Sequence, residues 1–192
     1  MRRLVAAIVM IGLAATAMAA PARKVDGYVA QGPVRLKLVD GFAVRGARGE
    51  KVTVHLFPVP LDDNDLARGR AGQAWSIALR KPSPNRRQWD WCPTVDIDMQ
   101  SLSGPLRSRA NLTFANFMFT GLDRRNHTVN LNRSGEQARA SLSTLEFSQS
   151  GGSQYVTLDS RARSLSYDGK TTYSWRIHAR LPVLQQAGDD ND

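Results

Sequence analysis

The sequence predicts an all-β domain, an antiparallel β-sandwich of about ten short strands with at most one short helix. Apolar and polar residues alternate over many short segments, which is the pattern of strands with one buried face. Gly, Pro, Asn and Asp cluster between these segments, as they do in turns. A closed β-barrel is the alternative, because its strands alternate in the same way.

Five segments show clear alternation and are predicted to be half-buried strands: residues 34–38, 52–56, 75–79, 95–99 and 171–181. In the last of these, Tyr173, Trp175 and Ile177 share one face, while Arg176 and His178 share the other. The apolar face of this strand is expected to lie in the core.

In two further segments, the alternation of apolar and polar residues shifts by one position partway along the segment. Leu112 and Phe114 are followed by Phe117, and Leu142 is followed by Leu145. A spacing of three is also helical, but the aromatic, Thr and Ser content of both segments favours strands. Each change of phase therefore predicts a β-bulge.

The one predicted helix covers about residues 61–70. Asp62, Asp63 and Asp65 stand at its start, where carboxylates cap free N–H groups and complement the helix dipole. A calcium site is the alternative, but the spaced loop with a glycine and a distal glutamate is missing. Capping is the preferred interpretation.

The first nineteen residues have the three parts of a secretory signal peptide. Arg2 and Arg3 precede an apolar run over residues 4–15, and Ala17 and Ala19 supply the small side chains of a cleavage site. The run is shorter than the roughly 20 residues of a membrane-spanning helix, so no transmembrane helix is expected. The protein is predicted to be periplasmic or secreted.

The sequence divides into three parts. A signal peptide over residues 1–19 precedes a single domain over 20–184, and 185–192 form a disordered acidic tail. The short signal and the single cysteine favour a bacterial source. Cys92, between Trp91 and Pro93, is interpreted as a buried small hydrophobe.

The chain carries 26 basic and 17 acidic residues, a formal net charge of +9. Such an excess favours polyanions, and after export these are an anionic envelope polymer or a lipid surface. Most of the cations are arginines, which suit phosphate and carboxylate contacts. A compositional bias without function explains the same excess, and no specific nucleic acid is predicted.

Two groups of residues are candidates for binding. Arg176, His178 and Arg180 share one strand face and, with Arg161 and Arg163, predict an anion-binding surface. The second group combines cations and indoles that can stack on sugars or bases: Arg86, Arg87, Trp89 and Trp91. A solvated strand face and core tryptophans are the alternatives.

Catalytic chemistry has one weak candidate. Asp96 and Asp98 share a strand face about 7 Å apart, a spacing that suits paired carboxylates in glycoside hydrolysis or metal binding. His55, His127 and His178 lack the short spacing of a zinc site, and no serine stands in a nucleophile elbow. We therefore predict neither a cofactor nor a metal.

Three functional hypotheses remain. The leading one is a non-catalytic exported β-sandwich that binds an anionic envelope component or a partner protein through its arginine-rich face. The second is an enzyme acting on envelope carbohydrate through Asp96 and Asp98. The third is a structural or assembly subunit, whose sign would be a stable multimer or an exposed unpaired strand.

Overall fold

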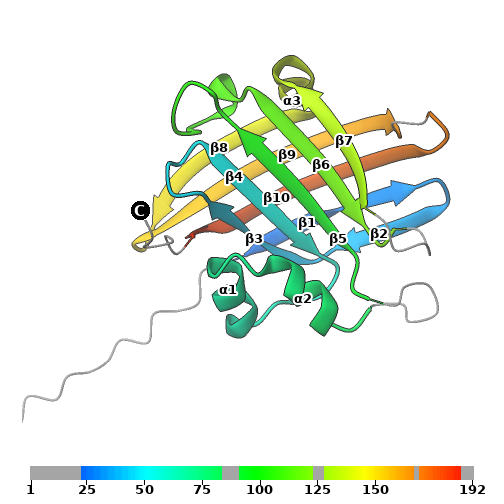
Figure 1. The fold of residues 1–192 in the computed structure, drawn as a ribbon, viewed down its shortest axis with the longest axis horizontal. Coiled ribbons are helices and arrows are strands. Elements are labelled where there is room, and N and C mark those ends of the chain that lie inside the picture. Colours follow the sequence, from blue (N-terminus) through cyan, green and yellow to red (C-terminus); the bar gives the residue numbers. More distant parts are fainter. Residues whose placement is uncertain (1–22, 84–90, 123–127, 167–168, 187–192) are drawn as a thin grey trace, which may run out of the picture.

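A computed structural model gives the fold and describes residues 23–83, 91–122, 128–166 and 169–186. Ten strands lie in these ranges (Figure 1). They are β1 (Lys24–Gln31), β2 (Val34–Leu38), β3 (Asp40–Arg45), β4 (Lys51–Phe57), β5 (Thr94–Gln100), β6 (Phe114–Thr120), β7 (Thr128–Ser134), β8 (Leu142–Ser150), β9 (Ser153–Leu165) and β10 (Thr172–Gln185). The helices are α1 (Asp63–Arg70), α2 (Ala74–Arg80), α3 (Gly135–Ser141) and the 3-10 helix η1 (Arg109–Asn111). Within these ranges, no helix has the length and apolar character needed to cross a membrane.

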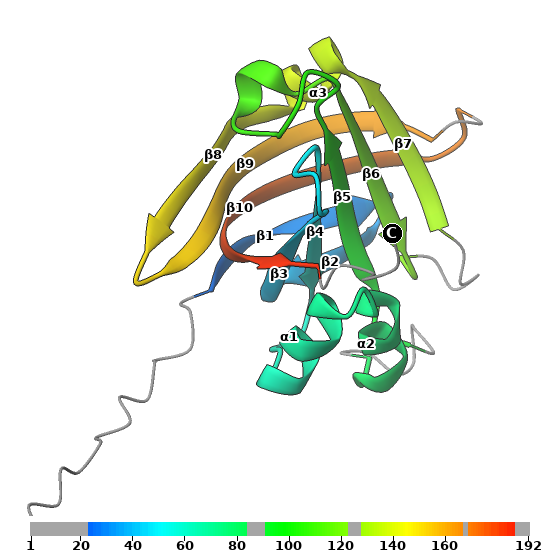
Figure 2. The ribbon, with the colours of Figure 1, turned by 60° about the vertical axis from the view of Figure 1, so that its left-hand side comes forward.

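The strands form one curled sheet with two arms. The back arm has the order β2-β1-β10-β9-β8, and the front arm has the order β10-β3-β4-β5-β6-β7. β10 belongs to both arms, because residues 172–182 pair with β9 whereas residues 183–185 pair with β3. Figures 1 and 2 show the front arm crossing the back arm, so that the sheet curls into a half-barrel.

β10 changes its partner on one edge close to Pro182. β1 pairs with β10 as far as Arg180, and β3 begins to pair with it at Val183. Pro182 lies between these two points and has no N–H to donate to a neighbouring strand. β10 therefore exchanges β1 for β3 at a residue that cannot donate a backbone hydrogen bond to either strand.

The all-β prediction is confirmed, but the purely antiparallel arrangement is wrong. Eight of the nine strand pairs are antiparallel, and β10 pairs with β3 in parallel. β2 runs antiparallel to β1, β10 runs antiparallel to β1 as well, and β3 follows β2 after Val39 alone. The parallel pairing of β10 with β3 shows that β3 keeps the direction of β2 and does not turn back as in a hairpin. All ten strands belong to one mixed sheet that curls into a half-barrel (Figure 2), so the sandwich stays a prediction.

The prediction of at most one helix is also wrong. α1 lies in the predicted place, but residues 75–79, predicted as a strand, belong to α2. α2 contains two Ala, one Leu and one Arg, which favour helix, and only Ile77 of the three alternating apolar residues is buried. α3 occupies a region of Glu, Gln, Ala and Arg that the turn signals around Gly135 obscured.

One of the two predicted bulges is present. The register of β8 against β9 shifts between Leu142 and Thr144, as the spacing to Leu145 indicated. β6 pairs with β5 without a shift, so the bulge predicted near Phe117 is wrong. Leu112 is buried ahead of that strand, where it ends η1, and does not belong to its alternation.

The main core fills the space between the two arms. Trp175 of the back arm lies 4.9 Å from Phe117 and 5.6 Å from Phe119 of the front arm, measured between ring centroids. Its indole Nε1 donates a hydrogen bond to Ser160 Oγ at 2.8 Å, so the polar atom is satisfied inside the core. These aromatic contacts join the arms into one unit.

A smaller core lies outside the front arm, beneath α1 and α2. It contains Phe42, Phe57, Leu61, Leu66, Ile77, Cys92 and Leu184. Gly69 of α1 lies so close to Phe42 that a Cβ there would stand 2.6 Å from the ring. A side chain at position 69 would therefore push α1 away from the sheet. Both helices are held near the strands that carry the candidate pocket described below.

Some predictions concern residues outside the described ranges. They are the signal peptide, the tail beyond Gln186, Arg86, Arg87, Trp89 and His127.

Candidate functional site

The predicted arginine stripe lies on the outer face of the back arm. Two neighbouring rows of residues cross β2, β1, β10 and β9 there. One row consists of Lys37, Tyr28, Arg176 and Arg161, and the next consists of Arg35, Ala30, Ser174 and Arg163. We call the five cations of these rows the basic face: Arg35, Lys37, Arg161, Arg163 and Arg176.

All five side chains of the basic face are exposed. Neither row contains a carboxylate, and in the described part of the chain none of the five forms an ion pair. The guanidinium of Arg35 lies over the ring of Tyr28, 3.6 Å from its centroid, which orients the cation without neutralising it. The charges of these rows are available to a ligand.

His178 and Arg180 lie on the same outer face but in the rows beyond. His178 Nδ1 is hydrogen-bonded to the carboxylate of Asp159, and Asp26 stands opposite on β1. The guanidinium of Arg180 lies 3.9 Å from the ring centroid of Tyr155. These two predicted site residues are half-buried and have partners, which distinguishes them from the basic face.

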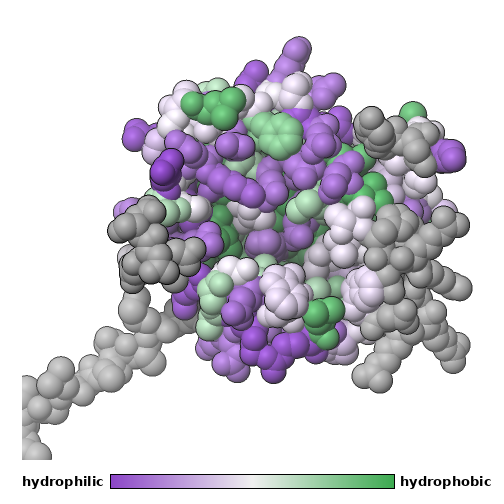
Figure 3. Space-filling view, viewed as in Figure 1, coloured by the Kyte–Doolittle hydropathy of each residue, from purple (hydrophilic) through white to green (hydrophobic). Residues whose placement is uncertain are grey.

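A cavity of about 620 Å³ lies on the opposite side of the molecule, between the outer face of the front arm and α2. β4, β5 and β6 supply its floor, and α2 and Trp91 supply its wall. Figure 3 looks onto this face, where hydrophilic side chains cover the strands above the hollow and the helices border it below. Its volume is in the range of small-molecule sites.

The floor of this pocket consists of cross-strand polar pairs. His55 Nδ1 and Asp96 Oδ1 are 2.8 Å apart, and the two residues stand directly opposite each other in β4 and β5. In the next pair, Thr53 donates from Oγ1 to Asp98 Oδ1, and Lys51 Nζ lies 3.5 Å from Asp98 Oδ2. The predicted carboxylates therefore share one face, each with its own partner.

The wall of the pocket is apolar and partly open. Trp75 and Leu79 stand four residues apart on α2, so they lie on one helix face, and the two residues are 69% and 65% exposed. Trp91, one of the two predicted indoles, and Met118 of β6 complete the apolar lining. Large apolar groups left exposed beside a cavity are typical of a binding site.

Sequence reasoning missed several members of both surfaces. Arg35 and Lys37 stand on the polar face of a predicted strand, but nothing in the sequence shows that this strand lies near Arg161. His55 likewise alternates with buried residues, and its pairing with Asp96 is set by sheet register. Trp75 was hidden by the wrong assignment of its segment to a strand.

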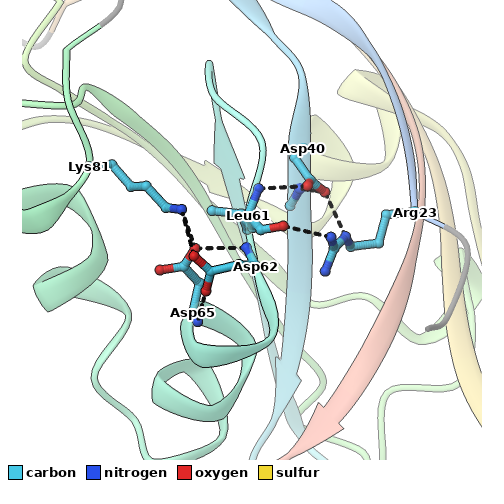
Figure 4. Close-up of polar contacts among 7 residues, drawn as sticks. Arg23, Asp40, Leu61, Asp62, Asp65 and Lys81 are labelled. Carbon is cyan, nitrogen blue, oxygen red and sulfur yellow. Dashed lines mark hydrogen bonds and ion pairs between the residues drawn. The ribbon is translucent and has the colours of Figure 1, made fainter.

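A polar network holds the helical segment against the sheet (Figure 4). Arg23 Nε lies 2.9 Å from Asp40 Oδ1, and Arg23 Nη2 donates to the carbonyl of Leu61 at 2.8 Å. Asp40 also accepts from the backbone N–H of Leu61 at 2.9 Å. The start of β1, the start of β3 and the segment that enters α1 are thereby joined at one buried point.

The second part of the network fixes α1 relative to α2. Asp62 and Asp65 form a capping box, each side chain accepting from the other's backbone N–H. Lys81, just after α2, lies 2.6 Å from Asp65 and 3.3 Å from Asp62. The capping interpretation of these aspartates is confirmed, and the lysine ties both helices into the wall of the pocket.

Cys92 is buried, as predicted. Burial raises the pKa of its thiol to about 12, and the charge of Lys81 opposes this only in part. The cysteine therefore packs as a small hydrophobe in the outer core. Among the described residues, no group of three or more His, Cys, Asp or Glu side chains is placed to hold a metal ion.

Comparison of the chain with protein-family models, curated proteins and solved structures gives no match, so its function is argued from its own residues.

Proposed function

We propose that this protein is an exported binding module that attaches to an anionic envelope surface through the basic face. The observation that carries the proposal is the pair of register rows that bring five exposed cations together without a carboxylate. The predicted signal peptide indicates that the protein acts outside the cytoplasm. Outside the cytoplasm, phosphate-bearing lipid headgroups are an abundant partner for such a surface.

The spacing of the cations supports an extended ligand. Neighbouring strands lie about 4.8 Å apart, and residues two apart in a strand lie about 6.8 Å apart. Five positive charges thus occupy a small area of a broad sheet face, where each repels the others until an anion compensates them. A surface with many phosphates compensates all five, whereas one small anion does not.

Arginine is well suited to this contact. Four of the five cations are arginines, whose planar guanidinium binds two oxygens of a phosphate or carboxylate at once. Each Lys or Arg held near an anionic membrane contributes about 1 kcal/mol of attraction, and the attraction is screened by salt. The proposed binding is therefore expected to be strong at low salt and to weaken steeply as salt is added.

Charge reversal tests the proposal. Arg161→Glu combined with Arg176→Glu places two carboxylates in the middle of the basic face. Sedimentation with vesicles of phosphatidylglycerol should show that wild-type protein binds at about 50 mM NaCl and is largely released at about 300 mM. We expect the double variant to bind at least about ten-fold more weakly, because it loses attraction and adds repulsion at two points.

The matched control is Arg48→Glu with Arg107→Glu. These exposed arginines lie outside the basic face, and the substitutions change the net charge by the same amount. Binding by this control should stay close to that of the wild type. Equal loss in the two double variants would show that net charge alone attracts the protein, and binding to neutral phosphatidylcholine vesicles would also contradict the proposal.

A further inference from the structure

We infer that the pocket between the front arm and α2 binds a neutral saccharide. This site is separate from the basic face, since the two lie on the outer faces of opposite arms with the main core between them. It does not depend on the proposed anion binding, and either surface can function without the other.

The wall of the pocket supplies an apolar platform. Trp75 exposes more than half of its surface beside a cavity instead of packing into the outer core that Ile77 of the same helix enters. Leu79 extends this platform by one helical turn. The C–H face of a sugar ring is apolar and flat, so it covers an indole and removes this exposed surface from water.

The floor supplies the polar contacts that orient a sugar. Asp96 binds His55 through Oδ1, and in the described part of the chain neither Asp96 Oδ2 nor His55 Nε2 has a hydrogen-bond partner. Both atoms belong to partly accessible side chains that line the pocket. A carboxylate oxygen accepts from sugar hydroxyls, and a ring nitrogen donates or accepts according to its tautomer. The pairing with Asp96 holds the imidazole in one orientation.

The charges of the floor select against other ligands. Asp96 and Asp98 repel anions, and among the described residues that line the pocket only Lys51 offsets them with a full charge. A small cation finds Asp98 already engaged by Lys51 and Thr53. A lipid chain would cover the carboxylates without giving them hydrogen bonds, which is costly. A neutral ring with hydroxyls on its edge and an apolar face satisfies both halves of the pocket.

The test is calorimetric titration of the mature protein with neutral disaccharides of glucose, N-acetylglucosamine and mannose. Binding of at least one is expected, with little dependence on salt because the ligand is uncharged. Trp75→Ala and Asp96→Asn should each weaken that binding at least about ten-fold, which corresponds to about 1.4 kcal/mol. Trp75 is largely exposed, so its truncation leaves the fold in place.

Two controls separate the alternatives. Leu102→Ala truncates another exposed apolar side chain, outside the pocket, and should leave saccharide binding unchanged. The Arg161→Glu, Arg176→Glu variant should bind saccharide as tightly as the wild type, although its binding to vesicles is weakened. The titration reaches a sugar concentration of about 10 mM, at which binding with a Kd of about 1 mM is detectable. The inference is wrong if the wild type binds none of the sugars under these conditions. Unchanged binding by Trp75→Ala would also overturn it.

Discussion

At the scale of single residues, burial decides which functional groups are reactive. Cys92 is inaccessible in the outer core, and its raised pKa keeps the thiol protonated at neutral pH. His55 and Asp96, by contrast, are only partly covered and lie in the pocket. The polar pair is therefore accessible from the pocket, whereas the cysteine packs in the outer core.

Native Cys92 should resist thiol reagents. With a pKa of about 12, about one thiol in ten thousand is ionised at about pH 8, and the thiolate is the reactive form. We expect almost no reaction of the folded protein with a disulfide reagent followed by absorbance, and complete reaction after unfolding in urea. Rapid labelling of the folded protein would show that the outer core opens readily.

At the scale of elements, the cap of α1 holds the pocket wall in place. α1 has eight residues and α2 has seven, which is too short for either to be stable alone. Their position depends on the outer core and on the network of Asp62, Asp65 and Lys81. Losing the cap should therefore loosen both helices.

Asp65→Ala should lower the free energy of unfolding by about 2 kcal/mol, because it removes half of the capping box and the nearest partner of Lys81. Urea unfolding followed by circular dichroism measures this. Asn64→Ala is the control, since this neighbouring side chain is exposed and forms no hydrogen bond among the described residues. Equal destabilisation by both substitutions would mean that the network contributes little.

The same network makes part of the stability depend on pH. Hydrogen bonding from the Asp65 backbone is the main cause that lowers the pKa of Asp62, and Lys81 adds to it. A carboxyl with a lowered pKa in the folded state stabilises the fold above its unfolded pKa. This contribution is lost as pH falls through the folded value. For Lys81, desolvation acts to lower the pKa, but its carboxylate partners outweigh it and raise the value.

At the scale of the whole molecule, β10 links the two arms. It contributes Trp175 to the main core and its last residues to the front arm. The outer face of the back arm carries the basic face, and the outer face of the front arm carries the pocket. Because the main core lies between them, a ligand bound at one does not block the other.

Phe117→Ala should destabilise the whole molecule by about 3 to 4 kcal/mol, because this ring is fully buried between the arms against Trp175. Differential scanning calorimetry should show a single transition at a lower Tm. Phe114→Ala, on the same strand but the opposite face, is the matched control and should cost less. Two separate transitions would contradict the view that the arms share one core.

Local patterns in the sequence predicted much of the strand content. Successive side chains of a strand point to opposite faces, so alternation alone placed Tyr173 and Trp175 in the core and Arg176 outside it. The same local rule placed Asp96 and Asp98 on one face. It failed for Trp75, because two alternations are too short to separate a strand from a helix of seven residues.

Local patterns were sufficient to predict the all-β class and the inward and outward faces of the clearest strands, and composition was sufficient for the excess of positive charge. Which strands are neighbours depends on the tertiary fold. It brought Arg35 beside the arginines of β9 and β10, and it placed His55 opposite Asp96. The physical reason is that side-chain direction is a property of the local backbone, whereas register depends on contacts between segments far apart in the chain.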